Sequence, residues 1–240
     1  MNYPSLSRSP RYSITFALPL LLAYEALAFA LSGSATEGVR NGADVLLKSL
    51  FLGLGGRDGL LIFDLLLLAG GAYLVWRDRE AGESWRWGVF LGMAAESVLY
   101  GLLFGGVAGL LTILLLEGPS ALSVGSGPAS GLGLSTQVML SLGAGIYEEL
   151  LFRVLLVSGI ALAWRTLFGG ARMAGIVATV VGALIFSAFH YIGPFGDSFT
   201  VATFAFRTIA GVLFSGLYLT RGFGITAWTH AIYDVLLALR

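Results

Sequence analysis

Long runs of hydrophobic residues, separated by short connections that hold most of the charges, make up this chain of 240 residues. A helix that crosses the hydrocarbon core of a bilayer needs roughly 20 mainly apolar residues. Seven runs come close to that length, and each predicts a membrane-spanning helix. The runs cover about residues 12–32, 58–76, 87–116, 136–164, 173–192, 199–220 and 223–239.

Two stretches leave the number of spans open. The stretch 43–56 is apolar but contains two charges and three glycines, so an interfacial or re-entrant segment is as plausible there as an eighth crossing. The run 87–116 is long enough for one tilted helix, although Gly105, Gly106 and Gly109 could break it. We therefore expect an all-α fold, a polytopic transmembrane helical bundle of about seven to eight spans.

The composition supports a membrane protein and argues against several other classes. Hydrophobic residues make up 57% of the chain and charged residues only 12%, far from the balance of a soluble domain. The chain has no cysteine, which removes disulfides, thiolate metal sites and a cysteine nucleophile. Its net charge of zero argues against nucleic acid as a partner. With no internal repeat and no long linker, residues 1–240 are expected to form a single integral membrane domain.

The arginines indicate how the chain is oriented. Arg8 and Arg11 precede the first apolar run, which we interpret as an uncleaved span because it is long for a signal peptide. If seven spans are used, further arginines fall on the same side: Arg77, Arg79, Arg86, Arg165, Arg172 and Arg221. Residues 118–135 carry no charge, which predicts a flexible non-cytoplasmic loop. We expect a cytoplasmic N-terminus and, with no eukaryotic targeting motif, a prokaryotic cell membrane as the location.

The hydrophobic runs contain a group of ionisable side chains. Each costs at least ~2.5 kcal/mol in a membrane by insertion scales, so such a group indicates a functional site. One run carries the sequence YEELLFR at residues 147–153. On a helix Glu149 and Arg153 lie four residues apart and can pair on one face, whereas Glu148 points about 100° away and remains available.

Two later runs repeat this spacing. Phe186 and His190 share a helix face, and so do His230 and Asp234. A single buried histidine or ion pair is more often structural than functional. Both histidines of the chain and its only Glu-Glu pair nevertheless fall within predicted spans, which favours a polar catalytic cavity between the later helices. His230 can lie at the same depth in the membrane as His190 only if residues 220–224 dip into the membrane or the helices tilt.

Three motifs on these later helices, in this order, resemble those of the CPBP family of intramembrane proteases: Glu148-Glu149-x-x-x-Arg153, Phe186-x-x-x-His190 and His230-x-x-x-Asp234. This family includes the type II CAAX prenyl endopeptidases and the bacterial Abi-type proteins. The stretch 211–222 also looks like the family's glycine-bearing helix and the connection after it. The resemblance covers about residues 136–240, and the first half resembles the family only as generic hydrophobic helices.

The resemblance implies a glutamate-type peptidase that uses no metal or other cofactor. Glu148, together with His190, would activate a water molecule for attack on a peptide carbonyl. His230 and Asp234 would stabilise the developing oxyanion or position the scissile bond. Many relatives carry Asn in place of Asp234, so this residue either orients His230 or is a protonated donor.

Three further residues would support the site: Glu149, Arg153 and Phe186. The first two would brace it as an ion pair. The implied reaction is the hydrolysis of a peptide bond in a membrane-anchored protein or peptide within the lipid bilayer.

Two other functions fit the same buried charges. A zinc-dependent membrane metallopeptidase could use Glu148, His190, His230 and Asp234 as ligands, although the chain has no His-Glu-x-x-His motif. A non-enzymatic transporter or interaction protein could use them as a proton relay or as polar contacts between helices. A rhomboid-like serine protease is disfavoured, because Ser130 lies in the uncharged loop.

Other polar residues within the predicted spans are less informative. Glu25, Asp64 and Glu96 could line a path for a substrate or a proton, but no spacing ties them to the cluster. The five tryptophans are interpreted as anchors at the membrane interfaces.

Overall fold

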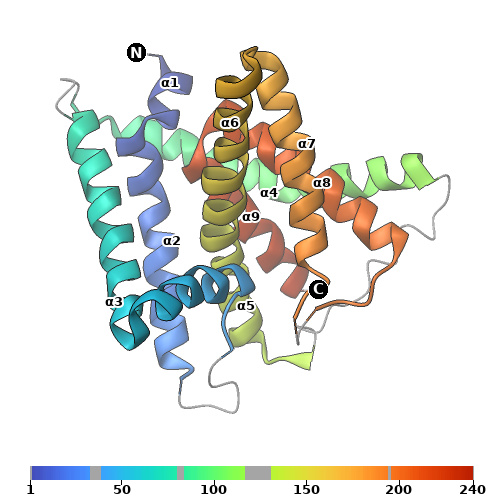
Figure 1. Cartoon of the computed structure of the whole chain (residues 1–240), viewed down its shortest axis with the longest axis horizontal. Helices are drawn as coiled ribbons and strands as arrows, with labels where there is room; N and C mark the ends of the chain where they lie inside the picture. Colours follow the sequence, from blue (N-terminus) through green and yellow to red (C-terminus); the bar gives the residue numbers. More distant parts are fainter. Residues whose placement is uncertain (1, 33–38, 80–83, 117–130, 194–195, 240) are drawn as a thin grey trace.

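The computed structural model describes residues 2–32, 39–79, 84–116, 131–193 and 196–239, and within these ranges it contains helices and no strand (Figure 1). The predicted all-α fold is therefore confirmed. The helices are α1 (Tyr3–Arg8), α2 (Pro10–Ala30), α3 (Gly42–Arg79), α4 (Trp87–Leu116), α5 (Leu134–Gly143), η3 (Ala144–Val157), α6 (Ser158–Phe168), α7 (Ala171–Phe189), α8 (Val201–Arg221) and α9 (Phe223–Ala238). Ser130 and most of the predicted uncharged loop lie outside the described residues.

Within the described part of the chain, five helical stretches are long and apolar enough to cross a membrane. They are α2, α4, the continuous helix from α5 through η3 to α6, α7 and α8. Many large apolar side chains on these helices point outward; Leu114, for example, is 67% exposed. An outer surface of this kind supports an integral membrane protein. The predicted number of seven to eight spans is not confirmed, because α9 has only 16 residues and α3 is bent.

The bend in α3 lies at Gly56, where φ is +59° and ψ is −146°. A side chain would be strained in this backbone conformation, so glycine permits the bend. Figure 1 shows that the part of α3 before the bend lies crosswise to the part after it. This geometry favours an interfacial or re-entrant segment at residues 43–56 over an eighth crossing, and the choice between them stays a prediction.

The helix α4 runs without a break over 30 residues. Two of its glycines serve packing, because a Cβ atom at Gly101 would lie 2.6 Å from Ile232, and one at Gly105 would lie 2.7 Å from Tyr233. Small residues let two membrane helices approach closely, and here they bring α4 against α9. Of the two predicted possibilities for residues 87–116, the single long helix is thus the one observed.

The motif at residues 147–153 lies in η3, a π-helical segment within the continuous helix. π-Helical turns are rare and often occur at functional sites. A Cβ atom at Gly145 would lie 2.5 Å from the carbonyl oxygen of Ala227, so η3 and α9 are in close contact. Gly182 of α7 allows a similar close approach to η3, because a Cβ atom there would lie 2.6 Å from the side chain of Val157. These contacts bring the three motif-bearing helices together.

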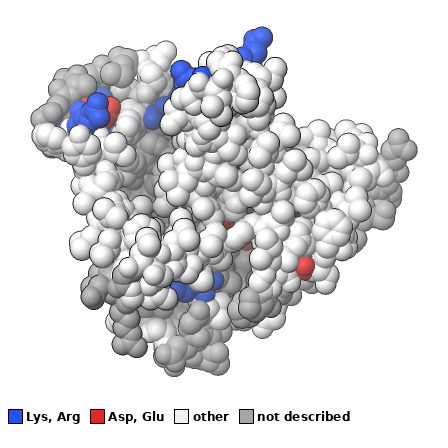
Figure 2. Space-filling view, viewed as in Figure 1, with Lys and Arg blue, Asp and Glu red and all other residues white. Residues whose placement is uncertain are grey.

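The basic side chains gather mainly at one end of the face shown in Figure 2, where α1, α3 and α6 have their ends in Figure 1. This agrees with the predicted grouping of arginines on one side, while the orientation of the N-terminus stays a prediction. Figure 1 also shows α8 and α9 inclined to the α5–η3–α6 helix. Such a tilt is one of the two ways by which we expect His230 to reach the membrane depth of His190.

Candidate active site

Glu149 and Arg153 form a buried ion pair on η3. Their side chains are 0% and 1% exposed, and Nη1 of Arg153 lies 3.2 Å from Oε1 of Glu149. The guanidinium lies over two aromatic rings, 4.4 Å from the centroid of Phe186 and 5.2 Å from that of Phe214. Contacts between a cation and a ring face are attractive and stronger when desolvated. The predicted pairing is therefore present, and aromatic rings complete the surroundings of the arginine.

His230 connects α9 to this ion pair. Its Nδ1 lies 2.7 Å from Oε1 of Glu149, and its ring stacks on Phe214 with a centroid distance of 4.3 Å. Its Nε2 lies 3.4 Å from Oδ2 of Asp234, one turn further along the helix. This second distance is longer than an ordinary hydrogen bond. Glu149 thus fixes the histidine ring, and Nε2 remains available to another group.

Glu148 points to a different group of residues than Glu149, as its position on the helix predicts. It is 8% exposed, and its Oε1 accepts a hydrogen bond of 2.9 Å from Nδ2 of Asn41. Its Oε2 is buried without a hydrogen-bond partner among the described residues. The carboxylate interacts electrostatically with His190 and His230. One carboxylate oxygen is therefore held, and the other is available for chemistry.

His190 lies at the C-terminal end of α7. Its Nδ1 is 2.9 Å from the carbonyl oxygen of Phe186, which can only accept a hydrogen bond, so Nδ1 is the donor. The Nε2 atom is then the ring nitrogen left for Glu148 or a water molecule. Phe186 contacts both histidines, with centroid distances of 4.8 Å to His190 and 6.2 Å to His230. Its ring therefore lies edge-on near both imidazoles.

The structure adds two residues that the sequence did not indicate as part of the site, Asn41 and Phe214. It also ties Glu25 to the motif, because the hydroxyl of Tyr147 donates a hydrogen bond of 2.8 Å to Oε1 of Glu25. Glu96 lies apart from the motif residues and pairs with Arg221 at 2.8 Å. No sequence spacing could have indicated Asn41, which is 107 residues from its partner.

An apolar cavity of about 840 Å³ runs along the other face of η3. Three residues at intervals of four contribute to it from this helix: Ile146, Leu150 and Val154. The rest of the lining comes from the end of α1, from α2, from the second part of α3, from the start of α6, and from the end of α8 with the connection to α9. The cavity therefore lies along the helix that carries Glu148 and Glu149, and its walls are mostly hydrocarbon.

The carboxylate and imidazole groups of the motifs do not converge as metal ligands would. Among the described residues, no group of three or more His, Asp or Glu side chains is placed to hold a metal ion. Zinc sites in proteins place three or four ligands at about 2.0–2.2 Å from one centre when these are nitrogen and oxygen. The observed contacts are instead those of a hydrogen-bonded and ion-paired cluster.

The comparison with known proteins agrees with the motifs. Residues 130–236 match the family model for type II CAAX prenyl endopeptidase Rce1-like proteins. No curated protein and no solved structure gives a match. The matched stretch includes all three motifs and begins after α4, so the predicted family resemblance is confirmed for the second half of the chain. Residues 130–236 are thus similar to Rce1-like type II CAAX prenyl endopeptidases, which is consistent with the CPBP family.

Proposed function

We propose that this chain is an intramembrane endopeptidase that hydrolyses a peptide bond of a membrane-anchored protein or peptide. The Rce1-like match supports peptidase activity in general. The observation that carries the more specific proposal is the environment of Glu148. Its Oε2 is buried without a hydrogen-bond partner in the described part of the chain, and the carboxylate interacts electrostatically with two histidines from two other helices. A carboxylate held in this way is suited to take a proton from water.

In the proposed reaction, a water molecule binds between Oε2 of Glu148 and His190. Glu148 takes one proton from the water molecule while the oxygen of this water attacks the carbonyl carbon of the scissile bond. The carbonyl oxygen then becomes an oxyanion. The proton then passes from Glu148 to the amide nitrogen as the C–N bond breaks. The water thus supplies the hydroxyl of the new carboxyl group and one hydrogen of the new amine.

His230 is proposed to donate a hydrogen bond from Nε2 to the oxyanion. Such donors stabilise a transition state most when they are fixed before the reaction. The 2.7 Å contact between Nδ1 and Glu149 provides that fixation, and Arg153 holds Glu149 in turn. Asp234 lies beside Nε2 and would help to aim it. Glu149 and Arg153 are therefore proposed to position the histidine without touching the substrate.

The helix that carries the site also borders an apolar cavity on its other face, which supports a substrate with a hydrocarbon anchor. The apolar cavity along η3 is lined by Leu150 and Val154, on the helix that carries the catalytic glutamate. We propose that residues 1–240 act as one membrane domain in a prokaryotic cell membrane, with the N-terminus in the cytoplasm. No metal or other cofactor takes part in the proposed mechanism.

The proposal can be tested with the purified protein in lipid vesicles. Fluorogenic peptides with and without a prenyl or acyl anchor would be offered to the wild type, to Glu148→Gln and to Glu96→Gln. The last variant is a matched control, since it changes an intramembrane glutamate outside the site. We expect cleavage by the wild type and the control, and none by Glu148→Gln, because an amide cannot take a proton from water.

Two results would contradict the proposal. Cleavage by Glu148→Gln at the wild-type rate would remove this residue as the base. Loss of wild-type activity after treatment with a zinc chelator, with recovery on addition of zinc, would favour the metallopeptidase alternative.

A further inference from the structure

We propose that Asn41 is a positioning residue for Glu148, and that a polar network from α2 and α3 holds Asn41 in place. This inference rests on the proposed function of Glu148 as the general base. It concerns a part of the chain that lies outside the Rce1-like match at residues 130–236. The first half of the chain would then supply part of the active site in addition to a hydrophobic scaffold.

The orientation of the Asn41 amide is fixed by its own contacts. Its side-chain oxygen accepts a hydrogen bond of 2.9 Å from the backbone N–H of Ala43, so the amide cannot be turned around without losing this bond. The Nδ2 group is thereby directed at Oε1 of Glu148, at 2.9 Å. The backbone N–H of Asn41 donates to the hydroxyl of Tyr24 at 3.3 Å. Asn41 itself is only 6% exposed.

A glycine directly before η3 makes room for this contact. A Cβ atom at Gly143 would lie 2.8 Å from Cβ of Asn41 and 2.6 Å from the ring of Tyr24. Real Cβ atoms essentially never approach so closely, so any larger residue would push Asn41 away. The sequence of the motif-bearing helix is thus adapted to a residue from a distant part of the chain.

Four charged residues clamp the segment on which Asn41 lies: Glu25, Arg40, Asp44 and Lys48, which we call the charged cluster. Arg40 contacts Glu25 and Asp44, each at 2.5 Å. Lys48 contacts the same two carboxylates at 3.2 Å and 3.0 Å. Asp64, which is 47% exposed, also lies 3.7 Å from Nζ of Lys48. The pairing of opposite charges partly compensates the cost of removing them from water. The cluster ties α2 to the start of α3 on both sides of Asn41.

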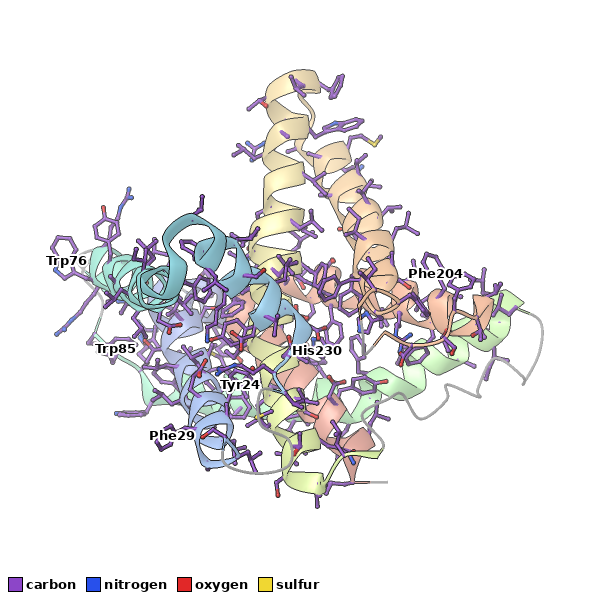
Figure 3. All side chains as sticks on the ribbon, turned by 60° about the horizontal axis from the view of Figure 1, so that its bottom comes forward. Tyr24, Phe29, Trp76, Trp85, Phe204 and His230 are labelled. Atoms are coloured by element: carbon purple, nitrogen blue, oxygen red, sulfur yellow. The ribbon has the colours of Figure 1, made fainter. Side chains whose placement is uncertain are left out.

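The charged cluster is connected back to η3 through two tyrosines. The hydroxyl of Tyr147 donates to Glu25 at 2.8 Å, and that of Tyr24 donates to Asp44 at 2.7 Å. The two rings contact edge to face with centroids 5.3 Å apart. Because Tyr147 directly precedes Glu148, the network holds the glutamate from its own backbone as well as from its side chain. Figure 3 shows Tyr24 and His230 in the central part of the bundle.

This closed network determines which carboxylate oxygen can react. With Oε1 of Glu148 committed to Asn41, the unpartnered Oε2 is the oxygen that meets water. Without the amide, the carboxylate could rotate about its last bond and sample unproductive directions. Orientation of a catalytic group contributes to the rate of the chemical step. Loss of Asn41 should therefore lower kcat and leave KM nearly unchanged, because Asn41 does not touch the substrate in this proposal.

The test compares steady-state cleavage by the wild type and three variants. Asn41→Ala removes the amide, and Asn41→Asp keeps the oxygen that caps Ala43 but replaces the donor by a carboxylate oxygen, which cannot donate and repels Glu148 when both are ionised. Ser141→Ala is the matched control, because this buried hydroxyl in α5 donates to the carbonyl oxygen of Gln137 at 2.9 Å, within its own helix and away from Glu148. We expect both Asn41 variants to lose about 10- to 100-fold in kcat, as for a hydrogen bond to a charged group. The control should keep the wild-type kcat.

A stability measurement separates this inference from the proposed function. The melting temperatures of Asn41→Ala, Glu148→Gln and the double variant would be compared, and a direct contact predicts effects that are not additive. Wild-type kcat in the folded Asn41→Asp variant, or a change confined to KM, would overturn the positioning role alone. Additive melting effects would overturn the contact itself. Non-additive melting effects in a protein that cleaves no peptide would overturn the proposed function and leave Asn41 as a structural partner only.

Discussion

Replacement of Arg153 by alanine is expected to destabilise the protein strongly, because it strands a buried carboxylate. Glu149 is 0% exposed and has two partners, Arg153 at 3.2 Å and His230 at 2.7 Å. Removal of one partner from a buried ion pair costs about 3–5 kcal/mol. Since His230 remains beside Glu149, Arg153→Ala should lie near the lower limit of that range.

The reverse change should be more severe. Glu149→Ala removes the carboxylate that pairs with Arg153 and leaves the guanidinium against the rings of Phe186 and Phe214. It also removes the partner of Nδ1 of His230. At about 2–4 °C per kcal/mol for a chain of this size, the melting temperature should fall by about 6–12 °C for Arg153→Ala and by about 10–20 °C for Glu149→Ala.

The measurement is thermal unfolding of purified protein in detergent, followed by tryptophan fluorescence, together with the folded yield in membranes. Arg221→Ala is the matched control, because Arg221 also pairs with a glutamate, Glu96, but the two side chains are 13% and 26% exposed. This pair is bidentate but partly exposed to its surroundings, so its loss should cost less than the loss of the fully buried pair. If Arg153→Ala accumulated normally and melted at the wild-type temperature, the bracing role would be wrong.

Three further predictions follow from the same geometry. Asp234→Asn should keep most of the activity, because Glu149 already fixes His230 and the Asp234 contact is 3.4 Å long; a loss of several orders of magnitude in a cleavage assay would make Asp234 the orienting residue. Gly145→Ala should lower both melting temperature and activity, since the new Cβ atom would lie 2.5 Å from a carbonyl oxygen of α9. Gly106→Ala should change neither, because its new Cβ atom would meet no atom of another described residue within 4 Å. Zinc chelators should leave cleavage unchanged, and inhibition reversed by zinc would refute this.

Contacts within one helix could be predicted from the sequence. The spacing of four residues that placed Glu149 beside Arg153, and His230 beside Asp234, follows from helix geometry alone and is observed. The order of the motifs also indicated the family that the comparison supports. Local periodicity and motif order therefore carried most of the information about the site.

Contacts between distant segments could not be predicted. Nothing in the spacing of Asn41 indicates that it meets Glu148, because their contact depends on the bend in α3 and on the close approach allowed by Gly143. The number of spans is not confirmed for a related reason. A count of apolar residues cannot tell a crossing helix from a bent or tilted one, such as α3 with its turn at Gly56.

The central claim is that Glu148 activates a water molecule for direct attack on the peptide bond. The most direct test is a single turnover in H₂¹⁸O, with the enzyme in excess over a cleavable anchored peptide. Mass spectrometry then measures the ¹⁸O content of the cleavage product and of the enzyme peptide that contains Glu148. Direct attack predicts one ¹⁸O atom in the new carboxyl group and none in Glu148. Label in Glu148 after the first turnover would mean that its carboxylate attacks the peptide itself, and would contradict the account.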